Sequence, residues 1–278
     1  MQIRLRQSLR FLAEELLYLA VCAEYRALDG WQAPRQKVLV NSSPKTGTTW
    51  VVRLLSSLPG YRRIGNFQGD LSRYHTVLPG DVVHGHDWYT PELGAILRSN
   101  HIKVIVTLRD PRDQTVSRMF HLRRDPNTPW YEKMNSLDDY EALMACIEGR
   151  PGLPSALDRI KLTQSWLQSD ADVLCVRYED MVADTAAILK QMLVFLGIRA
   201  QDRLVQAIVT RNRFERLTIG RRIWRPARQP GQENGGSHFR KGIVGDWKNY
   251  FHEAHVERFK QVAGEALIEL GYERDLDW

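Results

Sequence analysis

The stretch KVLVNSSPKTGTTWVVRLLSSL, residues 37–58, decides the fold. Residues 37–42 predict a short buried strand, and Ser43 and Pro44 end it. Residues 48–58 follow with the composition of a helix. A strand, a tight polar loop and a helix in this order are typical of α/β proteins, in which ligands bind beyond the carboxyl ends of the strands.

The same alternation of strands and helices continues along the chain. Strands are predicted at residues 81–86, 102–108 and 172–176. Helices are predicted at residues 112–122, 137–169 with a break around 149–154, 185–196 and 253–270. Alternating elements of this kind favour a mainly parallel β-sheet with helices on both faces. With 278 residues, we expect a single α/β domain over 1–278.

The composition excludes several classes of protein. Apolar residues make up 43% and charged residues 26%, which is typical of a globular chain and excludes disorder. No apolar run approaches the ~20 residues that span a bilayer, which excludes a polytopic membrane protein. The three cysteines, Cys22, Cys146 and Cys175, form no CxxC pair, so neither a zinc knuckle nor a redox dithiol is indicated. Sparse cysteines favour a reducing compartment, and we expect a cytoplasmic protein.

Positive charge gathers in one part of the sequence. The net charge is +6, and residues 201–250 hold eleven Lys and Arg against four Asp and Glu. This excess favours an anionic partner, which is a nucleic acid, a phosphorylated cofactor, an acidic substrate or a lipid surface. A solvated basic face is the other interpretation. Within this region, residues 220–238 are rich in Arg, Gly and Pro and predict a long mobile loop.

The N-terminus, residues 1–30, predicts an amphipathic helix rather than a signal peptide. Glu14 and Glu15 interrupt its leucine-rich stretch, and no small-residue cleavage site follows. Its leucines recur at helical spacing, at Leu5, Leu9, Leu12, Leu16 and Leu19. We expect this stripe to pack on the protein's own core. Peripheral contact of a basic amphipathic helix with a membrane surface is the second interpretation.

The loop after the first strand has the properties of an anion cradle. Gly47 allows a tight turn, so that consecutive amides at the helix start point at one spot. Thr46, Thr48 and Thr49 add hydroxyl donors, and Lys45 adds a positive charge. The order differs from the Walker pattern GxxxxGK[ST], because the lysine precedes the glycine. A strand–helix turn with a capping threonine is the plainer interpretation, but it explains only one of these residues.

The residues from Pro44 to Trp50 resemble the 5′-phosphosulfate loop, PK[ST]GTTW, of the cytosolic-type sulfotransferases. These enzymes use 3′-phosphoadenosine 5′-phosphosulfate (PAPS) as co-substrate and release 3′-phosphoadenosine 5′-phosphate (PAP). The resemblance implies that residues 45–49 bind the phosphosulfate and that Trp50 stacks on the adenine. It also implies the fold, a parallel sheet with a phosphate loop like that of P-loop proteins.

Two further blocks resemble the same family and occur in its order. Arg109 follows the strand at 102–108, and Ser117 comes about two helical turns later, so both can reach one phosphate. In the family, the matching Arg and Ser hold the 3′-phosphate. Residues 240–249 match RKGxxGDWKN, which implies that Arg240, Lys241 and Gly242 bind the same phosphate from the other side.

Two aromatic residues resemble the family's purine contacts. Phe214 lies where a family Phe covers one face of the adenine, although as part of RNRFE its surroundings differ. Tyr178, in RYED, corresponds to the Tyr of the family's YED. A strand-end tyrosine with no ligand is the plainer interpretation of Tyr178.

The resemblance implies in-line transfer of a sulfuryl group from PAPS to a hydroxyl, or less readily an amine, with no metal required. His86, at the end of the strand at 81–86, corresponds to the catalytic base. His84 lies two residues earlier on the same face and aligns with a family lysine. Lys45 offsets the charge on the departing 5′-phosphate. Ser117 engages this lysine before the acceptor binds, which restrains idle hydrolysis of PAPS.

Other functions remain open at this point. A P-loop nucleotide kinase or NTPase fits the loop but requires the Walker order. A nucleic-acid-binding protein explains the charge but not three phosphate-sized motifs at strand ends, so we expect no nucleic acid. A non-catalytic PAPS-binding relative has no use for His86 as a base.

No sequence motif identifies the acceptor. A small-molecule, lipid or glycan hydroxyl is expected, and four aromatic residues could build the acceptor wall, namely Trp88, Tyr89, Trp130 and Tyr131. The family's dimer segment, KxxxTVxxxE, keeps its end residues at Lys248 and Glu257 but has His252 and Glu253 at its centre. Dimerisation is therefore left open.

Overall fold

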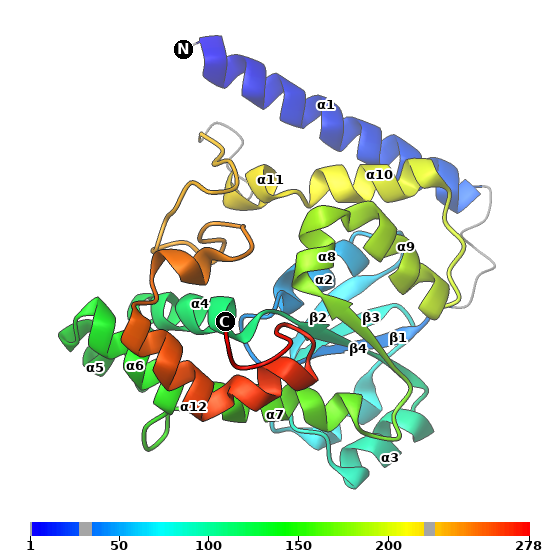
Figure 1. Ribbon diagram of the computed structural model, residues 1–278. Coiled ribbons are helices and arrows are strands. Elements are labelled where there is room, and N and C mark those ends of the chain that lie inside the picture. Colours follow the sequence, from blue (N-terminus) through cyan, green and yellow to red (C-terminus); the bar gives the residue numbers. More distant parts are fainter. Residues whose placement is uncertain (1, 28–34, 220–225) are drawn as a thin grey trace.

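The computed structural model describes residues 2–27, 35–219 and 226–278 and shows a single α/β domain (Figure 1). At its centre is a five-stranded parallel sheet with the strand order β2–β3–β1–β4–β5. The strands are β1 (Lys37–Asn41), β2 (Arg62–Asn66), β3 (Asp81–Gly85), β4 (Ile102–Leu108) and β5 (Val173–Arg177). The predicted fold class is confirmed.

The sequence predicts four of these strands to within one residue at each end and misses only the edge strand β2. Arg62 and Arg63 begin β2 exposed to solvent, and none of its five residues is buried. A strand with no buried face shows no alternation of apolar and polar residues. Nothing in its composition therefore distinguishes β2 from a loop.

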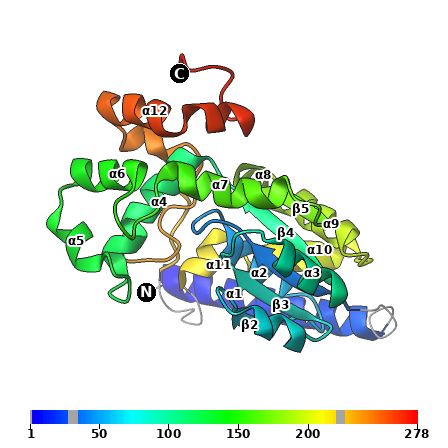
Figure 2. The same ribbon diagram turned by 90° about the horizontal axis from the view of Figure 1, so that it is seen from below.

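Helices cover both faces of the sheet, as Figure 2 shows. One face carries α2 (Thr48–Leu55), α9 (Thr185–Phe195) and α10 (Asp202–Arg211). The other face carries α3 (Pro91–Ser99) and α7 (Ala156–Leu167). Val38 and Val40 of β1 pack into the first core and Leu39 into the second. Because side chains alternate along a strand, each central strand stabilises both layers.

A second group of helices packs beside the sheet and does not cover it. It consists of α4 (Pro111–Arg124), α5 (Tyr131–Ser136), α6 (Asp139–Glu148) and α12 (Glu253–Glu269). In both ribbon views, α12 lies on the opposite side of the molecule from the N-terminal helix. Asp110 caps α4 by accepting a hydrogen bond from the Arg112 amide, and Pro111 occupies its first turn. This tight start places Arg109, between β4 and α4, at the carboxyl edge of the sheet.

The N-terminal helix, α1 (Gln2–Tyr25), lies across α10 with its leucine stripe facing away from the protein. The five leucines of the predicted stripe are between 49% and 60% exposed. Phe11, Tyr18, Val21 and Cys22, on the opposite side of the helix, are buried instead. The expectation that the leucines pack on the protein's own core is therefore wrong.

Ion pairs explain why α1 is rotated this way. Glu14 binds Arg213 at 2.8 Å, and Glu15 binds Arg211 at 3.0 Å and Arg216 at 2.8 Å. Arg211 ends α10, Arg213 lies in the short connection after it, and Arg216 belongs to α11 (Phe214–Ile219). The two glutamates that interrupt the leucine-rich sequence thus hold the helix with its leucines outward.

The segment before the third phosphate-binding block has no regular structure where it is described. Residues 226–238 form no helix or strand, and residues 220–225 of the predicted loop lie outside the described residues. The Arg228 guanidinium donates to the main-chain carbonyl of Gln232 at 3.0 Å and to that of Arg240 at 2.6 Å. The mobility of this loop stays a prediction.

Candidate active site

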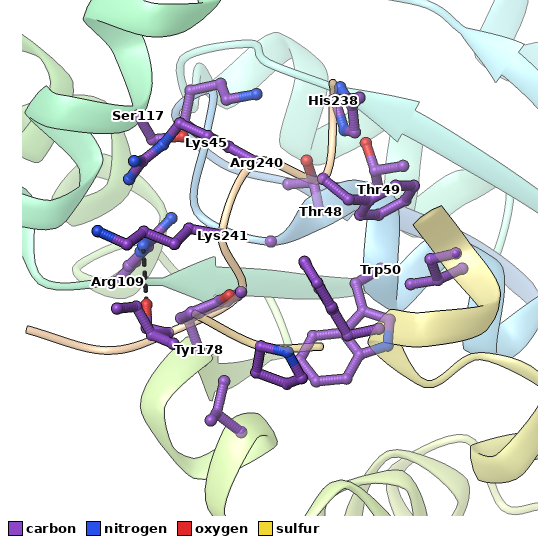
Figure 3. A pocket seen from close by; sticks show the side chains of 18 of the residues that line it. Lys45, Thr48, Thr49, Trp50, Arg109, Ser117, Tyr178, His238, Arg240 and Lys241 are labelled. Carbon is purple, nitrogen blue, oxygen red and sulfur yellow. Dashed lines mark hydrogen bonds between the residues drawn. The ribbon is translucent and has the colours of Figure 1, made fainter. Parts of the chain in front are cut away.

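A cavity of about 450 Å³ lies beyond the carboxyl ends of the central strands. Every residue predicted for the site lines it except Thr46. The predicted residues in its wall are Lys45, Gly47, Thr48, Thr49, Trp50, His86, Arg109, Ser117, Tyr178, Phe214, Arg240, Lys241 and Gly242. Figure 3 shows the cationic side chains on the same side as Ser117, with Trp50 at the other end.

The loop between β1 and α2 has a backbone that favours ligand binding. Lys45 and Gly47 both have left-handed backbones, with φ of 75° and 104°. A non-glycine residue in this region is strained, which is typical of functional loops. At Gly47 a Cβ atom would lie 3.0 Å from the Tyr178 ring and 3.1 Å from the Met181 methyl. Glycine is therefore required here both for the turn and for the close approach of Tyr178.

The main-chain N–H groups of Gly47, Thr48 and Thr49 find no acceptor among the described residues. They stand at the N-terminus of α2, where the helix dipole also favours an anion. Thr46 takes no part through its hydroxyl, because it donates to the Ser43 carbonyl at 2.9 Å and is buried. The prediction that the Thr46 hydroxyl is a ligand donor is therefore wrong, and its contribution is to hold the loop.

Lys45 stands in a strongly cationic part of the cavity. Burial, together with the nearby guanidinium groups of Arg124, Arg109 and Arg118, lowers the pKa of its ammonium group to about 7. Within the part of the chain that the structure describes, no carboxylate forms an ion pair with Lys45. A bound anion would supply the missing negative charge.

Arg109 is poised for a further hydrogen bond. Its Nη2 donates to the Ile243 carbonyl at 3.4 Å and lies 3.6 Å from Asp113. Its Nε is buried and has no partner, which marks an unused donor inside the protein. The guanidinium lies 4.3 Å from the centre of the Tyr178 ring. Ser117 lines the same cavity (Figure 3), so the structure places both members of the predicted pair in one wall.

Arg240 and Lys241 are already paired with carboxylates. Arg240 binds Glu233 at 2.7 Å and also Asp246, and Lys241 binds Asp246 at 2.6 Å. Asp246 belongs to the short helix η3 (Asp246–Asn249) and is buried. The GDWKN part of the motif therefore holds the two cations in place.

The aromatic residues predicted from the family pattern come together at the other end of the cavity. The Trp50 and Tyr178 rings meet edge to face at 6.0 Å, and Trp50 Nε1 donates to the Asn212 carbonyl at 3.0 Å. Phe214 packs directly against Gly242, where a Cβ atom would lie 2.4 Å from the ring. The side chains of Trp50, Tyr178 and Phe214 therefore form an aromatic part of the cavity wall beside the phosphate loop.

His86 has a defined tautomer. Its Nδ1 lies 2.6 Å from the Ser42 carbonyl oxygen, which can only accept, so Nδ1 carries the proton and Nε2 keeps its lone pair. Burial lowers the pKa of His86, and the hydrogen bond to Ser42 opposes that shift. The ring is therefore neutral near pH 7.

His84 shares the face of His86, as its spacing predicts, and the two rings meet at 4.6 Å. Its Nε2 lies 3.0 Å from the Thr48 hydroxyl. Burial and the neighbouring His86 together lower the pKa of His84 to about 3. An uncharged ring brings no positive charge to the position where the family pattern has a lysine.

With this geometry described, the comparison with known proteins is direct. A family profile described as "Sulfotransferase domain" matches residues 35–271. The chain belongs to this family. Among curated relatives, Sulfotransferase 6B1 of Mus musculus is 28% identical over 268 residues, which cover 87% of this chain and 82% of the relative. Amine sulfotransferase of Oryctolagus cuniculus is 25% identical, with 86% and 83% covered.

Solved structures agree with this family assignment. Mouse sulfotransferase SULT7A1 complexed with PAP has a TM-score of 0.66 and 25% identity, and the match covers 88% of this chain and 90% of that one. Retinol dehydratase in complex with retinol and PAP shares the fold, with a TM-score of 0.59 at 18% identity. The chain is a PAPS-dependent sulfotransferase, as predicted, and the kinase and non-catalytic alternatives are not favoured.

The sulfotransferase also has pocket residues that sequence reasoning missed. His121 lines the cavity one helical turn after Ser117, and its Nδ1 accepts a hydrogen bond from Arg124 at 3.0 Å. His238 lines it two residues before Arg240. The sequence signal that could have identified them is their position, four residues after Ser117 and two residues before Arg240.

Sequence reasoning also gave no role to Arg118, the residue of α4 that follows Ser117. Its Nε is buried without a partner among the described residues, and its charge helps lower the pKa of Lys45 and of His86. Burial also lowers the pKa of Arg118 itself. The guanidinium of Arg118 therefore acts electrostatically on both the phosphate loop and His86.

Sequence left the four aromatic residues Trp88, Tyr89, Trp130 and Tyr131 open between an acceptor wall and packing. None of the four lines this cavity. Trp130 is buried against α4 and α6, and Tyr89 packs on Trp166. Aromatic residues near a site in sequence need not share its face of the sheet.

The described residues contain neither a metal-binding cluster nor a helix suited to crossing a membrane. No cluster of three or more His, Cys, Asp and Glu side chains there is arranged to hold a metal ion. No helix there combines the length and the apolar character that crossing a membrane requires.

Proposed function

We propose that His86 is the general base that activates a hydroxyl acceptor for sulfuryl transfer. The hydrogen bond between His86 Nδ1 and the Ser42 carbonyl carries this proposal, because it leaves Nε2 as the free proton acceptor. The lowered pKa of His86 keeps the ring neutral at physiological pH. A neutral base held in one tautomer can take the acceptor's proton without first losing its own.

The cationic end of the cavity has the complementary task of stabilising negative charge. Bound PAPS supplies the sulfuryl group, which passes to the acceptor oxygen as its bond to the 5′-phosphate breaks. Lys45 and the free N–H groups of Gly47, Thr48 and Thr49 neutralise charge where it develops on the departing phosphate. Ser117, in the same wall, is close enough in the fold to restrain Lys45 before an acceptor binds.

Recognition of the nucleotide falls to the remaining residues of the wall. The unused Nε of Arg109, with Ser117, Arg240 and Lys241, fits a 3′-phosphate. Because Gly242 has no side chain, Phe214 packs directly against it, and a flat ring such as a purine fits near Trp50 and Tyr178. The separation of these compartments supports recognition of both ends of PAPS.

The acceptor is a small molecule, as the family implies, and we assign it a hydroxyl presented on a lipid, a glycan or a free metabolite. An amine is the second class, supported by the similarity to rabbit amine sulfotransferase. We also propose a cytoplasmic protein with peripheral membrane contact through α1. The free thiols of Cys22, Cys146 and Cys175 support a reducing compartment, and the outward leucines of α1 support the contact.

Two variants of His86 test this function. His86→Asn keeps a donor for the Ser42 carbonyl but has no base, and His86→Ala removes both. Transfer from labelled PAPS to a panel of phenols, alcohols, sterols and sugars should fall by about a hundredfold or more in both variants. Calorimetric titration should show unchanged PAP affinity, with ADP binding more weakly than PAP. Wild-type transfer by His86→Asn would exclude His86 as the base.

His121→Asn is the matched control. His121 lines the same cavity, but its Nδ1 accepts a hydrogen bond from Arg124. Its proton is therefore on Nε2, which can donate but cannot act as a base. Its variant should keep transfer within about tenfold of wild type. A loss as large as that of His86→Asn would reassign the base.

A further inference from the structure

The outward side of α1 is an uncharged apolar face on the surface of the protein. Leu5, Leu9, Leu12, Leu16 and Leu19 are all about half exposed and lie at helical spacing on one side. Ala13, Ala20 and Ala23 fall on the same side and are exposed too. Monomeric proteins rarely leave so continuous an apolar stripe uncovered, so it marks an interaction surface.

The acids of α1 are all neutralised by the protein itself. Glu14 and Glu15 face inward to the arginines of residues 211–216, and Glu24 binds Arg203 at 2.8 Å. α1 contains no other acid. The exposed part of the helix therefore carries no unneutralised negative charge.

The exposed charges beside the leucine face are positive. Arg6 and Arg10 lie along one edge of the stripe, and Arg26 lies at the other edge just after the helix. Arg10 lies 5.1 Å from the centre of the Phe11 ring and makes a long contact of 3.6 Å with Glu14. A leucine face bordered by arginines is the arrangement of helices that lie in the headgroup region of anionic bilayers.

We propose that α1 docks this sulfotransferase on an anionic lipid bilayer, with the leucine face in the acyl boundary and the arginines on the headgroup phosphates. The inference rests on the peripheral contact included in the proposed function and names the surface and the lipid charge. A second copy of this chain is a poorer occupant, because it would offer arginines opposite arginines. Anionic headgroups complement all three.

The docked orientation brings the cavity to the lipid surface. The inner side of α1 holds Arg213 and Arg216 of the segment that carries Phe214 and Leu217 into the cavity wall. In Figure 1, α11 lies on the same side of the sheet as α1. Because these ion pairs join the docking helix to the segment that lines the cavity, docking through α1 would hold that part of the cavity wall near the bilayer.

Vesicle flotation with the full-length protein tests this. Wild type should float with vesicles of phosphatidylcholine and phosphatidylserine, bind pure phosphatidylcholine weakly, and dissociate as salt rises. Leu12→Gln with Leu16→Gln should weaken binding about tenfold or more, because two inserted side chains become polar. Arg6→Gln with Arg10→Gln should reduce the preference for phosphatidylserine while retaining the weak binding to phosphatidylcholine.

The matched control carries Leu78→Gln with Val194→Gln, two exposed apolar residues outside α1. It should float as wild type does. PAP affinity, measured on every variant, reports folding and separates this inference from the proposed role of His86. Three results overturn the inference: no flotation of wild type, flotation unchanged by the leucine variant, or a dimer in light scattering that the leucine variant dissolves.

Discussion

The cations of the cavity and its surroundings are held in two ways. Arg240 and Lys241 are bound to Glu233 and the buried Asp246, so each positive charge has a partner before any ligand arrives. Lys45 and two arginines whose charges act on it, Arg118 and Arg124, form no ion pair within the described part of the chain. The fold therefore neutralises one group of cations and leaves the other group without a carboxylate.

The difference separates positioning from catalysis. Paired cations have fixed side chains and bind a phosphate without rearranging. Unpaired buried cations are costly in the free protein and are stabilised most when negative charge appears beside them. We therefore expect charge to develop beside the unpaired cations during the reaction, and binding at the paired cations to be independent of the reaction.

The largest effect should come from Lys45→Met. Turnover should fall by about a thousandfold, because the cation that stabilises the departing phosphate is lost. Lys241→Met, which removes a paired cation, is the matched control and should raise the KM for PAPS by about tenfold with little change in kcat. Steady-state kinetics with labelled PAPS measure both. Equal losses of kcat in the two variants would contradict the division between paired and unpaired cations.

A smaller effect is expected on stability from Asp246→Asn. Its buried carboxylate is the shared partner of Arg240 and Lys241, so its loss should cost about 3 kcal/mol of the free energy of unfolding. Saturating PAP should reduce this cost, because a phosphate restores negative charge beside the two cations. Urea unfolding with and without PAP measures the difference. A cost unaffected by PAP would place the ligand phosphate elsewhere.

The smallest effect is a pH dependence of PAP binding. The pKa of Lys45 is about 7 in the free protein, and an anionic ligand favours its charged form. Affinity should be greatest where Lys45 is protonated, below pH 7, and should fall by up to about tenfold per pH unit above it. Calorimetry from pH 7 to pH 9 should show this fall in wild type. A Lys45→Met variant with the same slope would show that another group titrates.

The chemistry at strand ends was predictable because it depends on short, contiguous segments. The loop at Lys45–Trp50, the Arg109–Ser117 pair and the Arg240–Gly242 block each contain their own geometry, whether in a turn or over two helical turns. The parallel sheet then brings such segments together, since the carboxyl ends of its strands share one edge. For the first two segments, convergence on one cavity follows from the fold class; the Arg240–Gly242 block follows no strand, and the tertiary structure brings it there.

The two predictions that were wrong, for the Thr46 hydroxyl and for the leucines of α1, both concerned the direction in which side chains face. Thr46 and Thr48 are equally polar in sequence, but the first hydroxyl turns to Ser43 and the second toward His84. The leucines of α1 have the period of a packing stripe, but the helix packs through Phe11 and Tyr18. Periodicity reveals a face and cannot say what covers it.

The sequence by itself determined the α/β class and, through its resemblance to a known family, the cofactor class, because local residue patterns carry both. It also supplied the proposals for the phosphate loop and for the base. Only the tertiary structure decided the tautomer of His86, the neutrality of His84 and the outward turn of the leucines. These depend on burial and on partners distant in sequence, such as Ser42 for His86 and Arg213 for Glu14. The free energies of burial and pairing are properties of the packed molecule, and no local pattern contains them.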